Sequence, residues 1–119
     1  MLRRVGFFRE FRGAGASLAE APRGDSDPRV FMYLQGAPVA IATPGFVYEP
    51  GPSKRPMAAA HLRTDGTWLW PEELPTLIRR YRIRLPEQFV EHMAAKNWVA
   101  SPLSTEDLAA VEAKLVGGT

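Results

Sequence analysis

Hydrophobic and polar residues alternate at the start of the chain. Residues 4–11 divide between two sides, with Val5, Phe7 and Phe11 on one and Arg4, Phe8 and Glu10 on the other. A period of two is typical of a β-strand, so this pattern predicts a strand over 4–11. The small residues from 13 onward end that strand, and we expect a loop up to Gly24 with one helical turn at residues 17–21.

The next segment predicts a helix, a strand and a long loop. The helix runs from Pro28 to Gln35, with Ser26 or Asp27 as its N-terminal cap and Gly36 in a left-handed conformation after its last turn. Alternation over 38–43 predicts a second strand. Four prolines and two glycines follow in 44–57, which predicts a loop that is either functional or an unimportant mobile excursion.

Residues 60–70 carry the signature of a β-hairpin. Asp65-Gly66 lies between two alternating runs, which is typical of a two-residue type I′ turn. This turn predicts the pairs Thr64–Thr67, Arg63–Trp68, Leu62–Leu69 and His61–Trp70. His61, Arg63, Trp68 and Trp70 then share one face of the hairpin, and the pattern leaves open whether helices cover that face or the opposite one.

Three helices are predicted after the hairpin. The first begins at Pro71, has Glu72 and Glu73 in its first turn and presents an apolar stripe up to Tyr81. The second starts at Pro86 and ends near Asn97, and Ser104 caps the third together with Asp107. Strands followed by helices predict one α+β domain over 1–119, a small antiparallel sheet of about four strands with helices packed on one face.

Composition removes several classes of function. The chain has 119 residues, no cysteine and a formal net charge of +2, so it has no disulfides, thiolate metal site or cysteine nucleophile. No apolar run approaches the ~20 residues that span a bilayer, and four arginines interrupt residues 1–12, unlike a signal peptide. We therefore expect a cytoplasmic protein that does not contact membranes.

No catalytic, metal or cofactor motif is visible. The two histidines, His61 and His92, have no metal-ligand spacing and no local partner that marks a catalytic triad. The run Gly13-Ala14-Gly15 follows a predicted strand, but Leu18 stands where a dinucleotide-binding loop needs its third glycine. We therefore expect a protein that is not an enzyme and uses no cofactor.

The tryptophan face of the hairpin is the strongest candidate for a binding surface. Tryptophan and arginine are enriched among the residues that dominate binding energy, and Arg63 opposite Trp68 favours a cation–π contact. If helices cover this face instead, the candidate surface disappears.

A wider pattern supports a protein partner. The pattern consists of the block from Arg63 to Pro71, of Tyr81 and of the run from Leu85 to Met93. In these residues the middle of the chain resembles small bacterial proteins, some of which resemble the immunity proteins of polymorphic toxin systems. This resemblance implies a domain that binds and neutralises a toxin. An excess of basic residues disfavours a nuclease as the target. The expected contact residues are Arg63, Trp68, Trp70, His61, Tyr48 and Glu49.

The alternative partner is a nucleic acid. Four arginines lie at the end of one predicted helix and in the connector after it, at positions Arg79, Arg80, Arg82 and Arg84. They are close enough in sequence to form one phosphate-binding patch. The same arrangement is also typical of a solvated helix end with favourable charge.

Overall fold

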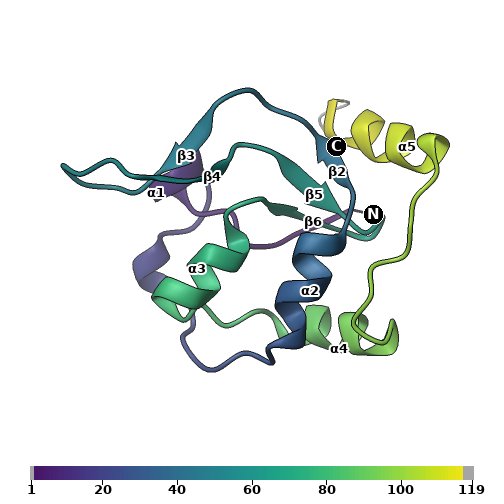
Figure 1. Ribbon diagram of the computed structural model, residues 1–119, viewed down its shortest axis with the longest axis horizontal. Coiled ribbons are helices and arrows are strands. Elements are labelled where there is room, and N and C mark those ends of the chain that lie inside the picture. Colours follow the sequence, from purple (N-terminus) through teal and green to yellow (C-terminus); the bar gives the residue numbers. More distant parts are fainter. Residues whose placement is uncertain (1, 117–119) are drawn as a thin grey trace.

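The computed structural model describes residues 2–116 and shows an α+β fold (Figure 1). Within those residues the strands are β1 (Arg3–Arg4), β2 (Val39–Ile41), β3 (Phe46–Tyr48), β4 (Pro56–Ala59), β5 (Leu62–Thr64) and β6 (Trp68–Pro71). The helices are α1 (Arg9–Arg12), α2 (Arg29–Gly36), α3 (Leu74–Tyr81), α4 (Glu87–Ala95) and α5 (Thr105–Val116), with a 3-10 turn at Leu18–Glu20. No helix in this part of the chain is long and apolar enough to cross a membrane.

The main sheet has the order β1-β6-β5-β2. β2, β5 and β6 are antiparallel to one another, whereas β1 is parallel to β6, so the sheet is mixed rather than wholly antiparallel. Helices α2, α3 and α4 lie on one side of it in Figure 1, and α5 packs beside β2 at its edge. The predicted fold class is confirmed.

The predicted hairpin forms, but its turn and register differ from the prediction. Thr64 pairs with Leu69 and Arg63 with Trp70, so four residues, 65–68, lie between the last paired positions instead of the two that were predicted. The carboxylate Oδ1 of Asp65 accepts the N–H groups of Thr67 and Trp68 at 2.9 and 2.7 Å, and these hydrogen bonds close the turn at the start of β6. Because the register moves by two residues, every side chain stays on the face that the sequence predicts.

The prediction of a strand over residues 4–11 is wrong for most of its length. Only Arg3 and Arg4 form strand β1, and Gly6 leaves the strand with a φ of +80°. Residues 9–12 then make the single turn of α1. Phe8 is buried and Phe11 half-buried, and this spacing of three places both side chains on the same side of a helical turn.

The prediction of a loop over 44–57 holds for residues 49–55 but is wrong for residues 46–48 and 56–57, which form strands. β3 and β4 pair as a second, two-stranded sheet, and residues 49–55 connect them. Prolines are compatible with this sheet because Pro44 precedes β3, Pro50 and Pro52 lie in the connection, and Pro56 is the first residue of β4. We call residues 46–59 the arm, which projects at the upper left of Figure 1.

The predicted helices are present, with corrections at their ends. Pro71 belongs to β6, so α3 starts at Leu74 rather than at Pro71. Gly36 is the last residue of α2 and does not adopt the left-handed conformation that the sequence suggested. The predicted cap of α5 is confirmed, because Ser104 and Asp107 exchange hydrogen bonds at 3.0 and 3.1 Å.

The core is built around the tryptophan face of the hairpin. The ring of Phe89 on α4 stacks on Trp68 with centroids 4.6 Å apart and lies 5.4 Å from Trp70. Tyr33 on α2 packs against both Trp70 and Phe89. The structure therefore decides the open question of the hairpin, because helices cover the tryptophan face.

Candidate functional site

Trp68 and Trp70 are core residues rather than surface residues. Both side chains are buried, and Trp70 donates its indole N–H to the carbonyl of Leu34 at the end of α2, at 3.3 Å. The guanidinium over the Trp68 ring belongs to Arg3, 4.2 Å from the ring centroid, and not to Arg63 as predicted. The sequence-predicted tryptophan surface is therefore not available to a partner.

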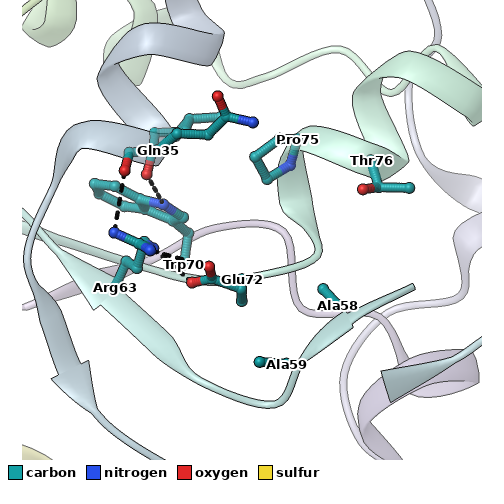
Figure 2. A pocket seen from close by; sticks show the side chains of 9 residues that line it. Gln35, Ala58, Ala59, Arg63, Trp70, Glu72, Pro75 and Thr76 are labelled. Carbon is teal, nitrogen blue, oxygen red and sulfur yellow. Dashed lines mark hydrogen bonds and ion pairs between the residues drawn. The ribbon is translucent and has the colours of Figure 1, made fainter. Parts of the chain in front are cut away.

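Arg63 lines a small pocket of about 160 Å³ between the arm, α2 and α3. Figure 2 shows its guanidinium held between the carboxylate of Glu72 and the carbonyl of Gln35. The Arg63 Nε lies 2.5 Å from Glu72, and Nη1 donates to the carbonyls of Gln35 and Ala37 at 3.1 and 2.5 Å. Arg63 thus satisfies carbonyls at the end of α2, and most of its donors are already used.

Glu73 also differs from its predicted role. Sequence reasoning assigned it to the first turn of a helix as a complement to the dipole, whereas it precedes α3 and is fully buried. Arg12 forms a bidentate pair with it, at 2.8 Å from Nε and 2.6 Å from Nη2. Nothing in the local sequence indicates this pair, because 61 residues separate its members.

The two histidines occupy different networks. His61 Nδ1 accepts the backbone N–H of Thr43 at 2.9 Å, and His92 Nε2 lies 3.0 Å from Oδ2 of the buried Asp65. The same Oδ2 accepts the hydroxyl of Tyr33 at 2.6 Å. Desolvation and this hydrogen bond raise the pKa of Tyr33, so its hydroxyl stays protonated as a donor.

The Asp65–His92 pair has the carboxylate–imidazole arrangement that orients the base of a hydrolase. Within residues 2–116, Asp65 is the hydrogen-bond partner of the His92 ring, and no serine or threonine hydroxyl forms a hydrogen bond with it. The same region contains no group of three histidine, cysteine or carboxylate residues placed to hold a metal. The pair joins α4 to the hairpin turn.

The arm carries the exposed aromatic surface. Phe46 and Tyr48 lie on one face of β3 with 59% and 49% of their surface exposed, while Val47 between them is buried. The sequence prediction included Tyr48 but missed Phe46, because it treated these residues as loop rather than as strand positions i and i+2.

Glu49, also predicted as a contact residue, holds the arm in place. It forms an ion pair with Arg80 of α3, and α1 packs beside β3. These contacts orient the aromatic face relative to the rest of the fold.

The four arginines of the alternative prediction do not form one free cluster. Three of them have partners, namely Phe31 for Arg79, Glu49 for Arg80 and Asp25 for Arg82. Within residues 2–116, the side chain of Arg84 has no hydrogen bond or ion pair in the structure. Much of the charge expected for phosphate binding is already engaged.

The chain was compared with known protein families, curated proteins and solved structures. No family model, curated protein or solved structure matches the chain.

Proposed function

We propose that the protein is a non-enzymatic binding domain that contacts another protein through the aromatic face of its arm. The main support is that Phe46 and Tyr48 lie next to each other and are both exposed to solvent. They belong to a small sheet that an ion pair connects to the rest of the fold. Two large aromatic side chains beside each other on water-facing strand positions are typical of an interaction surface. The partner is expected to cover both rings.

The resemblance of residues 63–93 to immunity proteins supports a more specific version of this proposal. In that version the domain binds a toxin in a fixed ratio and blocks it by covering its surface. This mode of action needs a projecting surface that is held in place, and the Glu49–Arg80 ion pair joins the arm to α3. Residues Trp68, Trp70 and Arg63 then act as the scaffold behind the arm rather than as contacts.

A photo-crosslinking experiment tests the site directly. A photoreactive phenylalanine analogue replaces Phe46 or Tyr48 in the full chain, and matched controls carry it at Met32 or Val99. These control positions are equally suitable because they are 69% and 65% exposed and also apolar, but lie outside the arm. Irradiation in extracts of the source cells should give the same discrete protein adduct from both arm positions and not from the controls.

The strength of the contact gives a second measurement. Once the crosslinked partner is purified, Phe46→Ala and Tyr48→Ala should each weaken the complex by about 1–2 kcal/mol, as expected of aromatic contact residues. Neither change should lower the melting temperature noticeably, since both rings are exposed. Adducts at all four positions, or at none, would refute the arm as the binding site, and adducts of RNA or DNA would support the nucleic-acid alternative instead.

A further inference from the structure

A groove whose lining contains no residue of the arm lies near the N-terminus of the described region. It is a groove of about 760 Å³ with residues 4–8 along one wall and 83–87 along the other, and residues 16 and 20–22 also line it. Four buried apolar side chains, Val5, Phe8, Ile83 and Leu85, contribute to this lining. Its size is within the range of about 300–1,000 Å³ that is usual for ligand sites.

The rim of this groove carries charges of both signs. Arg4, Arg84, Glu20 and Glu87 all line it. Among residues 2–116 the structure gives none of these four side chains an ion pair or a hydrogen bond. By contrast, the side chains of eight other arginines are engaged by a carboxylate, an amide or carbonyl oxygen or an aromatic ring. Two cationic and two anionic groups thus remain available to a ligand that itself carries both charges.

On the same wall, the structure gives the backbone N–H and C=O of Arg4 no hydrogen bond to any other residue of 2–116. β1 is an edge strand, and the N–H groups of Arg3 and Val5 donate to the carbonyls of Thr67 and Leu69 at 2.8 and 3.0 Å. Backbone groups alternate in direction along a strand, so the N–H and C=O of Arg4 point away from β6. An extended ligand along this edge can therefore pair with them as an added strand does.

We propose that this groove binds short apolar peptides that have both termini free. The ligand side chains cover the apolar lining, its backbone pairs with the free edge at Arg4, its carboxylate meets Arg4 or Arg84, and its ammonium meets Glu20 or Glu87. A peptide fits this rim better than a fatty acid, which would pair only with the two arginines, or an uncharged ligand, which would pair with none of the four charged groups. This site does not depend on the proposed function of the arm.

Isothermal titration with four forms of one tetrapeptide, Leu-Ala-Leu-Ala, tests the proposal. The forms are the free peptide, the N-acetylated, the C-amidated and the doubly blocked peptide. The free form should bind about tenfold more tightly than the doubly blocked form, because each exposed ionic contact contributes a few-fold. Each singly blocked form should lie between them.

Variants then assign each terminus to its side chains. Arg4→Gln and Arg84→Gln should reduce the preference for a free carboxylate, and Glu20→Gln and Glu87→Gln should reduce the preference for a free ammonium. Arg9→Gln is the matched control, because Arg9 is also exposed and its side chain has no partner among the described residues, but it does not line the groove. It should leave all four affinities unchanged.

Blocking the groove gives an independent readout. Ala21→Trp places a large ring on its lining and should abolish binding of the free peptide, with circular dichroism to confirm folding; Ala16→Trp serves if that variant does not fold. Equal affinities for free and blocked peptides would overturn the proposal. That result would indicate that the groove binds an internal segment of a larger protein instead of a short peptide. Absence of binding, or equal losses with Arg9→Gln and Arg84→Gln, would overturn it as well.

Discussion

The ion pair between Arg12 and Glu73 has one fully buried partner, and removing the other partner should be costly. The Glu73 side chain is fully buried, whereas 18% of the Arg12 side chain is exposed. Arg12→Met keeps most of the apolar stem but leaves a carboxylate in the interior without its counter-charge. Breaking a buried pair in this way usually costs about 3–5 kcal/mol.

The lower end of that range applies here, because water can reach the exposed part of the vacated site. We therefore expect Arg12→Met to lower the free energy of unfolding by about 3 kcal/mol. With an unfolding entropy of about 2.1 cal/mol/K per residue, that loss lowers the melting temperature by about 12 °C. Urea denaturation at neutral pH and a thermal melt followed by circular dichroism measure the two quantities.

Two further variants separate the ion pair from the loss of any arginine. Arg9→Met changes an exposed residue of the same helix and should stay within about 0.5 kcal/mol of the wild type. The double variant Arg12→Met/Glu73→Leu replaces the whole pair by apolar groups and should recover most of the lost stability. A loss below about 1 kcal/mol for Arg12→Met, or a double variant as unstable as the single one, would refute this reasoning.

Three other predictions concern the core and the pH limits of stability. Trp68→Ala should destabilise the fold by about 3–5 kcal/mol in urea titration, because the ring is buried against Phe89; a melt unchanged from wild type would contradict its place in the core. Burial and the Asp65 hydrogen bond raise the pKa of Tyr33 above its ordinary 10.0, so the unfolding free energy should fall as the pH rises past about 10, and Tyr33→Phe should lack that part of the fall. Hydrogen bonds from the side chain and the backbone N–H of Arg29 lower the pKa of Asp27 from 3.8 to about 2. The stabilisation of the folded state by the Asp27 carboxylate should therefore be lost as the pH falls between these values. An Asp27→Asn variant whose unfolding free energy depends on acid pH as in the wild type would contradict this.

The parts of the fold that local patterns predicted are those with one dominant local signal. Prolines and caps predicted α4 and α5 to within a residue or two, and Asp65-Gly66 predicted the hairpin. The register could not be predicted as easily, because a Gly after an Asp is compatible both with a two-residue turn and with a longer turn closed by the aspartate side chain.

The strand prediction for the N-terminal region was wrong for a different reason. Its aromatic residues fit a period of two, which places Phe7 and Phe11 on one side, and also a spacing of three, which places Phe8 and Phe11 on one side. So few positions do not decide between the two patterns. What favours the helical turn of α1 is long-range: it brings Arg12 to the buried Glu73. A single sequence contains no signal for a contact between residues so far apart.

The candidate surface was predicted only in part. Tryptophan is a common contact residue, but it is also highly buried on average, and the sequence could not decide between these roles for Trp68 and Trp70. The arm was missed as a strand pair because prolines argue against strands, although here they occupy the first position of β4 and the connection. Position along a strand, rather than composition, determines whether a proline is tolerated.

The carboxylate of Asp65 has a consequence for how the molecule opens. It accepts two N–H groups of its own turn and contacts Tyr33 of α2 and His92 of α4, so one side chain joins three parts of the chain. The turn therefore cannot fray without releasing both helices from it. In hydrogen exchange, the Thr67 amide should be protected about as long as the core strands although Thr67 is exposed, so this turn unfolds with the core as one cooperative unit.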